Sequence, residues 1–91
     1  AAVISMTKTL ALEWGPSQIR VNAIAPGFID TRFSAALTSN DEIKDMIIKR
    51  TPLGRIGAPD DLSGLALFLG SDAAGFVTGA TYVADGGMTI G

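Results

Sequence analysis

Few side chains in this sequence could carry out catalysis by themselves. The 91 residues include no cysteine and no histidine, which excludes cysteine nucleophiles, Cys/His zinc sites and a Ser-His-Asp triad built within the chain. Tyr82 is the single tyrosine and no lysine follows it, so we interpret it as a strand residue that fills a core or an interface. The adjacent carboxylates Asp60 and Asp61 suit the first turn of a helix better than a metal pair. We therefore expect no metal site.

Two glycine-containing segments could lie against a ligand. Gly70 to Gly75 has the spacing of a phosphate-binding loop, but Phe76-Val77 stands where that loop needs Lys and Ser or Thr, so it is interpreted as a helix end and a turn. Pro26-Gly27 ends an apolar strand, and glycine allows the backbone to turn sharply or to approach a ligand closely. Proteins of the α/β class place ligands at such carboxyl ends of strands. The alternative is an ordinary turn in which Thr31 only caps a helix.

Hydrophobic periodicity predicts the elements that position these segments. The expected elements are helices over 1–14, 31–37, 41–50 and from Pro59 onward, and strands over 19–25 and 80–84. Gly15-Pro16 ends the first helix, because glycine tolerates the left-handed cap position and proline cannot continue a helix. This order of elements predicts an α/β fold with a parallel strand pair.

Local signals indicate the ends and the faces of these elements. Ser39 and Glu42 have the spacing of a capping box for the helix over 41–50. Asn22 lies inside a strand, where a buried amide needs partners, so we expect it to form structural hydrogen bonds. The expected apolar faces of the last two helices comprise Ile43, Met46 and Ile47, and Leu62, Leu65, Ala66 and Leu69.

Composition indicates one folded domain over residues 1–91. Hydrophobic residues make up 47% of the chain and charged residues 18%, which is typical of a protein with a packed core. The net charge of −2 and the seven scattered Lys and Arg residues provide no basic patch for nucleic acid. No apolar run approaches the length that spans a bilayer, and no secretory leader is recognised. We expect a soluble, cytoplasmic protein without a membrane partner.

The predicted sheet is incomplete, because two strands are too few to be stable on their own. The sequence therefore predicts further strands, supplied by an absent N-terminal segment or by a partner chain. Met6, the first methionine, lies within the pattern of the first helix, so the start is expected to be internal to a longer polypeptide. We expect the isolated chain to be only weakly stable, since its strand edges are unpaired.

Seven segments of the chain match one known family in order. They are Lys8–Glu13, Ile19–Gly27, Thr51–Gly57, Pro59–Asp61, Phe68–Leu69, Thr78–Gly79 and Asp85–Gly87. Together they resemble the C-terminal portion of the short-chain dehydrogenases/reductases, beginning just after the Tyr-x-x-x-Lys motif of that family. The resemblance implies that the two strands are the last two of a Rossmann-like, doubly wound parallel sheet.

The resemblance also implies an activity. Members of the family transfer hydride between NAD or NADP and a carbonyl or alcohol substrate, and use a Ser, a Tyr and a Lys in the proton transfer. None of these catalytic positions falls within this chain, so the chain alone is expected to be inactive. The resemblance implies instead a clamp for the nicotinamide carboxamide, through backbone groups at Ile29 and the hydroxyl of Thr31. The full set of implied clamp residues is Pro26, Gly27, Phe28, Ile29 and Thr31.

The substrate side and the partners are implied in the same way. Phe33 and Leu37 would contact substrate, with residues 33–50 as a lid, although apolar residues at this spacing also suit plain helix packing. Members of the family are commonly homotetramers or homodimers, so oligomerisation of the intact protein is implied. An alternative is a truncated or accessory chain that acts only through protein–protein contacts. The residues encoded immediately before Ala1 distinguish the two, because Tyr-x-x-x-Lys there favours the enzyme.

Overall fold

The computed structural model describes residues 2–32 and 34–90. The chain folds into two compact units, of which unit 1 comprises Ala1–Ala25 and Gly64–Val83, and unit 2 comprises Pro26–Ser63 and Ala84–Gly91. The elements are α1 (Ala2–Trp14), η1 (Gly15–Ser17), β1 (Ala23–Pro26), α2 (Ala35–Thr38), α3 (Asp41–Arg50), α4 (Asp60–Leu69), η2 (Asp72–Ala74), β2 (Thr81–Ala84) and η3 (Met88–Ile90). Within the described ranges, no helix is long and apolar enough to cross a membrane.

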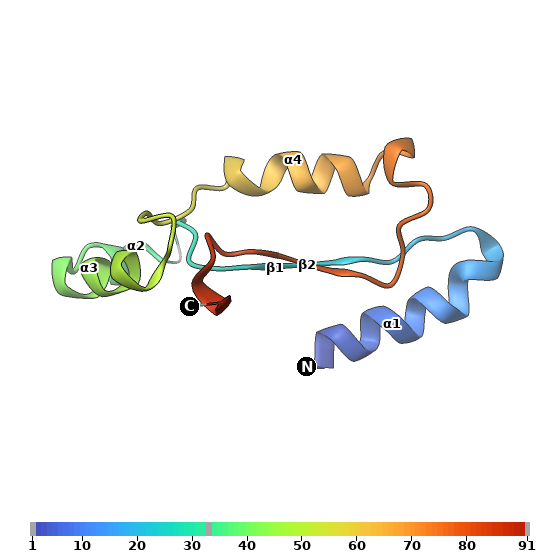
Figure 1. Ribbon diagram of the computed structural model, residues 1–91, viewed down its shortest axis with the longest axis horizontal. Helices are drawn as coiled ribbons and strands as arrows, with labels where there is room; N and C mark the ends of the chain where they lie inside the picture. Colours follow the sequence, from blue (N-terminus) through green and yellow to red (C-terminus); the bar gives the residue numbers. More distant parts are fainter. Residues whose placement is uncertain (1, 33, 91) are drawn as a thin grey trace. The chain divides into compact units, whose positions relative to one another are not determined.

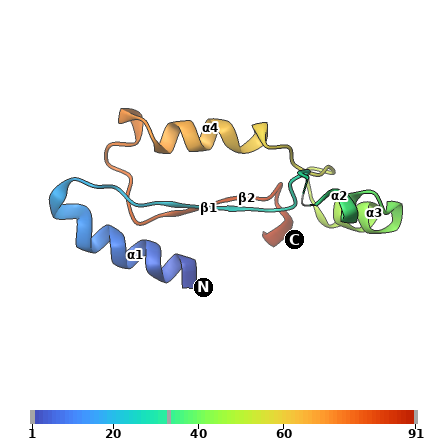
Figure 2. The same cartoon turned by 180° about the vertical axis from the view of Figure 1, so that it is seen from behind.

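The strands β1 and β2 form a parallel pair, as the sequence predicts. The N–H of Ala23 donates to the carbonyl of Ala80 (2.9 Å), and the N–H of Gly27 donates to the carbonyl of Ala84 (3.2 Å), so the partner numbers rise together along both strands. Pro26 has no N–H, and the alternation of the strand places it on the edge away from β2, where this pairing is unaffected. In unit 1, α1 and the part of α4 from Gly64 onward lie on opposite sides of the pair (Figure 1 and Figure 2).

The strand β1 begins later than predicted, because side chains replace part of its ladder. The N–H of Val21 donates to the hydroxyl of Thr78 (3.1 Å). The amide of Asn22 donates to the carbonyl of Val77 (2.9 Å) and accepts from the N–H of Ala80 (3.2 Å). The predicted hydrogen-bonding role of Asn22 is therefore confirmed, and the regular strand starts only after it.

The helix α1 confirms the predicted first helix, but its end differs in one detail. Gln18, and not a glycine, takes the left-handed conformation (φ 62°), and its N–H donates to the carbonyl of Gly15 (2.8 Å). Thr7 and Ala11 are the buried residues of α1, whereas Leu12 is 81% exposed. The helix thus buries a narrow, small-residue stripe and leaves larger apolar side chains uncovered.

The helix α3 has the predicted bounds, but the predicted capping box is wrong. The side chain of Asn40 accepts from the N–H groups of Glu42 (3.0 Å) and Ile43 (3.2 Å). The hydroxyl of Ser39 instead donates to the carbonyl of Ala36 (3.0 Å). Asn caps helices as well as Ser does. Because Asn40 directly precedes the first helical residue, its side-chain amide oxygen can accept from the free N–H groups of the first turn.

The helix α4 begins just after Pro59 and ends at Leu69, whose carbonyl is bound by the side chain of Arg20. Of its predicted apolar face, Leu62, Leu65 and Leu69 are half-buried, and Ala66 is exposed. The guanidinium of Arg20 donates to the carbonyls of Leu69 (2.8 Å) and Ser71 (3.3 Å). A cation at this end satisfies free carbonyls and opposes the negative pole of the helix dipole.

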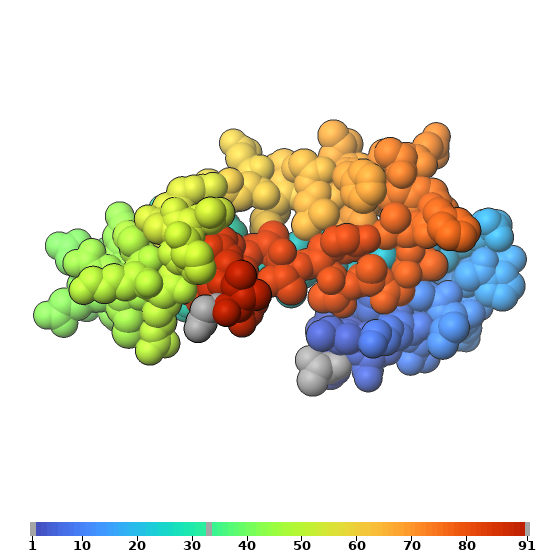
Figure 3. All heavy atoms as spheres, in the orientation of Figure 1, coloured from blue at the N-terminus to red at the C-terminus, as the bar shows by residue number. Residues whose placement is uncertain are grey.

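The buried core is small, and much apolar surface is uncovered. Among the described residues, the buried apolar side chains are Ala11, Ile47 and Ala74. In contrast, Leu67 of α4 is 75% exposed and Phe76 is fully exposed. Figure 3 shows side chains of α1 and of residues 64–76 at the visible surface. Apolar surface on this scale is typical of a face that packs against further protein.

Candidate functional site

Gly27, the first residue after β1, packs against the first residue after β2. A Cβ atom at position 27 would lie 2.8 Å from Cβ and 2.9 Å from Cα of Asp85. Carbon atoms that are not bonded to each other do not pack this closely. Glycine is therefore needed because two backbone segments of the protein meet here, while the preceding Pro26 is exposed.

The next residues pair with a distant segment and leave one peptide edge open. The N–H of Gly57 donates to the carbonyl of Phe28 (2.9 Å), and the N–H of Asp30 donates to the carbonyl of Gly57 (2.8 Å), which is a parallel bridge between Ile29 and Gly57. In such a bridge the N–H and C=O of Ile29 point to the other side. Among residues 2–32 and 34–90, the N–H of Ile29 has no hydrogen-bond acceptor.

Thr31 and Ser34 close the loop on that other side. The hydroxyl of Ser34 accepts from the N–H of Thr31 (2.8 Å) and donates to the carbonyl of Ile29 (2.8 Å). The hydroxyl of Thr31 lies 3.4 Å from both the hydroxyl and the N–H of Ser34, so it is only weakly engaged. Ser34, and not Thr31, is the residue at the N-cap of α2. The interpretation of Thr31 as a helix cap is therefore wrong.

A bidentate ion pair fixes the segment that carries Gly57. The guanidinium of Arg55 donates to both carboxylate oxygens of Asp61 (2.7 and 2.9 Å), and the N–H of Ala58 donates to the same carboxylate (2.7 Å). Hydrogen bonds from Arg55, and next from Ala58, hold the pKa of the Asp61 carboxyl far below its usual value. The same pairing raises the pKa of Arg55. Because the pair spans the residues around Gly57, it steadies the strand-like contact with Ile29.

The carboxylate of Asp85 is committed to the turn after β2. One oxygen accepts from the N–H of Gly87 (2.9 Å) and the other from the N–H of Thr89 (3.0 Å). The side chain of Thr89, together with these N–H groups, lowers the pKa of Asp85 despite partial desolvation. The ionised side chain therefore shapes the turn.

The two glycines of this turn lie against residues 51–53. Gly86 (φ 66°) and Gly87 (φ 92°) both take left-handed conformations. A Cβ at Gly86 would lie 2.6 Å from Cγ2 of Thr51, and one at Gly87 would lie 2.9 Å from Cγ of Pro52. The N–H of Leu53 donates to the carbonyl of Gly86 (3.0 Å). Both glycines are therefore required by conformation and by space.

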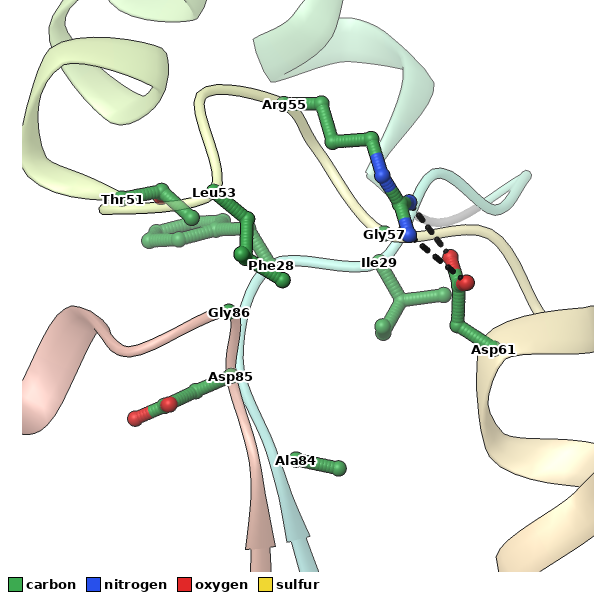
Figure 4. A pocket seen from close by; sticks show the side chains of 10 residues that line it. All are labelled: Phe28, Ile29, Thr51, Leu53, Arg55, Gly57, Asp61, Ala84, Asp85 and Gly86. Atoms are coloured by element: carbon green, nitrogen blue, oxygen red, sulfur yellow. Dashed lines mark hydrogen bonds and ion pairs between the residues drawn. The ribbon is translucent and has the colours of Figure 1, made fainter.

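These contacts surround a cavity of about 210 Å³ within unit 2. Its lining residues are Phe28, Ile29, Thr51, Leu53, Arg55, Gly57, Asp61, Ala84, Asp85 and Gly86. Figure 4 shows Phe28 beside Leu53, and the Arg55–Asp61 pair on the side of Ile29. The cavity is smaller than ordinary small-molecule sites, which occupy roughly 300–1,000 Å³.

The structure brings together part of the predicted site. Phe28 and Ile29 line the cavity, and Thr31 is half-buried in the loop that follows. Leu37 lies in α2, is 47% exposed and is not among the lining residues. Phe33 lies outside the described residues, so its predicted substrate contact is untested.

Sequence reasoning missed three residues that hold this loop in place, namely Ser34, Arg55 and Asp61. The spacing Thr31-x-x-Ser34 is a signal for a hydroxyl-closed turn, because a Ser side chain reaches backbone groups three residues away. The Arg55–Asp61 pair crosses a helix boundary, and no helical spacing marks it.

Comparison with known proteins assigns the family. Residues 1–89 match a family model described as enoyl-(acyl carrier protein) reductase. The chain is 47% identical over 88 residues to a 3-oxoacyl-[acyl-carrier-protein] reductase of Chlamydia trachomatis, a match that covers 97% of this chain and 35% of that protein. The chain belongs to the short-chain dehydrogenase/reductase family.

The fold of this short-chain dehydrogenase/reductase chain is also similar to that of solved structures. A gluconate 5-dehydrogenase from Burkholderia cenocepacia in complex with NADP and tartrate is 41% identical with a TM-score of 0.94, covering 99% of this chain and 35% of that one. A 4-hydroxyisoleucine dehydrogenase complexed with NADH is also 41% identical, with a TM-score of 0.95, covering 99% and 37%. This confirms the predicted family and α/β class. The chain spans about a third of the length of these relatives.

Proposed function

We propose that the protein carrying this chain is an oxidoreductase that transfers hydride between NAD or NADP and a carbonyl or alcohol substrate. The relatives support this, since they are a reductase and dehydrogenases, two of them in complex with NADP or NADH. They lend no support to the alternative of an accessory chain that acts only through protein contacts. The compounds that give these relatives their names differ in chemistry, so we propose the reaction and not one substrate.

The contribution proposed for this chain is the contact with the nicotinamide carboxamide. The observation that carries it is the open edge of Ile29, whose N–H has no acceptor within the described ranges and lies close in sequence to the weakly engaged hydroxyl of Thr31. A primary amide offers one acceptor oxygen and two donor hydrogens. The N–H of Ile29 fits the amide oxygen, and the hydroxyl of Thr31 fits an amide N–H. When bound, the nicotinamide supplies the hydride chemistry.

Each neighbouring residue has a proposed part in this contact. Pro26 and Gly27 set the course of the backbone, and the packing of Gly27 on Asp85 supports that part. Phe28 presents a side chain that is 42% exposed, as an apolar side chain beside a ligand would be. On the substrate side, we propose that Phe33 and Leu37 contact the substrate and that the α2–α3 segment covers it.

We further propose that this chain provides the last two strands of a doubly wound sheet, and that the proton-transfer residues belong to the rest of the protein. The coverage of about a third of each relative supports this division. The uncovered apolar side chains of Leu67 and Phe76 also support it, because they offer surface for further protein. That further protein includes other subunits if the whole protein is a homodimer or homotetramer.

The test is Thr31→Ala in the full-length protein. We expect kcat/KM for the dinucleotide to fall about tenfold, which corresponds to one hydrogen bond of roughly 1.4 kcal/mol. Single-turnover hydride transfer should slow as well, because a less constrained ring spends less time in reactive alignment.

Thr38→Ala is the matched control. Thr38 belongs to the same segment, but within the described residues its hydroxyl makes only long contacts, with the carbonyls of Ser34 (3.2 Å) and Ala35 (3.4 Å) and with the carboxylate of Asp30 (3.5 Å). Thr38→Ala should leave kcat/KM for the dinucleotide unchanged, because Thr38 has no proposed contact with the carboxamide. Wild-type kinetics in Thr31→Ala would remove the proposed carboxamide contact.

A further inference from the structure

Ser34 occupies a capping position without capping. It is the N-cap residue of α2, and its carbonyl accepts from the N–H groups of Leu37 and Thr38 (both 3.0 Å). A serine at this position ordinarily accepts, through its hydroxyl, from an N–H of the first helical turn. Here the side chain forms no such bond. The hydroxyl of Ser34 is therefore used for something other than the helix.

That hydroxyl links the two residues proposed to contact the carboxamide. It accepts from the N–H of Thr31 at 2.8 Å and donates to the carbonyl of Ile29 at 2.8 Å, with the carbonyl of Thr31 as a longer alternative acceptor at 3.2 Å. A hydroxyl has one hydrogen, so only one carbonyl receives it at a time. The shorter bond ties the peptide group of Ile29 to that of Thr31.

Ile29 is thus held from both sides. On one side, the N–H of Gly57 donates to the carbonyl of Phe28 (2.9 Å), and the carbonyl of Gly57 accepts from the N–H of Asp30 (2.8 Å). Ser34 binds the carbonyl of Ile29 itself from the opposite side. With both in place, the orientation of the open N–H of Ile29 is fixed relative to Thr31. Without the Ser34 hydroxyl, the carbonyl of Ile29 and the N–H of Thr31 lose their shared partner. The N–H of Ile29 and the hydroxyl of Thr31 are then no longer held in a fixed relative position.

We propose that Ser34 is a positioning residue that sets the Ile29 N–H and the Thr31 hydroxyl to match the nicotinamide carboxamide. This inference rests on the proposed function of the loop. It assigns a role to a residue that does not itself contact the dinucleotide. Its effect is therefore confined to the nicotinamide end, because preorganised groups improve binding only of the ligand part they meet.

The test compares two probes on the full-length protein and its Ser34→Ala variant. The first probe is NADH or NADPH, whichever the protein accepts. The second is ADP-ribose or its 2′-phosphate, which keeps the rest of the dinucleotide and lacks the nicotinamide. We expect the dissociation constant of the first probe to rise about tenfold in Ser34→Ala, equal to about 1.4 kcal/mol. The dissociation constant of the second probe should stay unchanged.

Two further variants complete the design. Ser34→Thr keeps a hydroxyl and should restore most of the affinity for the reduced dinucleotide. Ser39→Ala makes the same deletion five positions later, where the hydroxyl donates only to the carbonyl of Ala36, and should bind both probes like the wild type. If Ser34→Ala does not fold, Ser34→Cys takes its place, because a thiol keeps a similar volume and is a weak donor.

The outcomes separate this inference from the proposed function. Wild-type binding by Ser34→Ala, with weakened binding by Thr31→Ala, overturns the positioning role and leaves the carboxamide contact standing. Wild-type binding by both variants overturns both. Equal loss of both probes in Ser34→Ala, without recovery in Ser34→Thr, indicates a general structural role and also overturns the inference.

Discussion

An alanine at Gly86 should destabilise the protein through two separable effects. The first is backbone conformation, since Gly86 has φ 66°, a region that costs a side-chain-bearing residue about 1 kcal/mol. The second is space, since the new Cβ would lie 2.6 Å from Cγ2 of Thr51. Thr51 is buried, and its hydroxyl donates to the carbonyl of Ile47 at 2.8 Å, so the methyl group cannot rotate away without breaking that bond.

Gly54 separates these two effects. It has nearly the same conformation (φ 74°), but a Cβ there would meet nothing within 4 Å. Gly54→Ala should therefore cost only the conformational part, about 1 kcal/mol. Gly86→Ala should add the cost of forcing a methyl group into a filled space, roughly 1–3 kcal/mol. We expect a total of about 3 kcal/mol for Gly86→Ala.

Urea unfolding of the full-length variants measures the difference. The wild type, Gly86→Ala and Gly54→Ala should be compared at the same protein concentration, because association of subunits adds to the apparent stability by mass action. The m-values should agree, so that midpoints report free energies of unfolding directly. If Gly86→Ala proves no less stable than Gly54→Ala, the close packing of the turn after β2 on Thr51 is refuted.

Two further changes probe other polar contacts by urea unfolding. Asn22→Leu leaves the carbonyl of Val77 and the N–H of Ala80 without their side-chain partner. It should therefore lower the free energy of unfolding by about 2 kcal/mol. An unchanged urea midpoint would count against this pairing. The pKa of Asp61 is lowered by Arg55, so its stabilising effect is complete above the unfolded-state value near 4 and fades as pH falls below it. Asp61→Asn should therefore lose less stability than the wild type between pH 6 and pH 3, and parallel pH profiles would contradict this reasoning.

The sequence predicted the elements well where periodicity determines them. The helix α3 has the predicted bounds because its apolar residues recur at helical spacing and polar breakers flank it. The parallel direction of β1 and β2 followed from the helical connection between them. Both signals are repeated along several residues, so one atypical residue does not obscure them.

The ends of the elements were predicted less well, because single hydrogen bonds decide them. Ser39 and Asn40 are equally good caps, and only the position of the first helical residue selects Asn40. The start of β1 was placed too early because the amide of Asn22 substitutes for backbone partners. Amphipathic patterns do not distinguish a backbone ladder from a side chain that replaces one.

The candidate site was predicted as a stretch of sequence, while the contacts that hold it come from elsewhere. The loop after β1 was singled out, but its support by Gly57 involves a residue almost thirty positions away. The Asp61 carboxylate that fixes this neighbour pairs with Arg55 across a helix start. Such partners share no period with the loop, so no local pattern could reveal them.

Gly27 and Ser34 support the loop after β1 through different contacts. The lack of a side chain at Gly27 is explained by Asp85, 2.8 Å from the position of a Cβ. Within the described residues, the N–H of Ile29 has no acceptor and the hydroxyl of Thr31 is weakly engaged, and the backbone at these two positions is held by Gly57 and Ser34. We therefore expect a substitution at Gly27 to displace the strand ends, and a substitution at Ser34 to act on the two groups proposed to contact the nicotinamide. A substitution at Gly27 should accordingly lower the stability of the protein, whereas a substitution at Ser34 should mainly weaken nicotinamide binding.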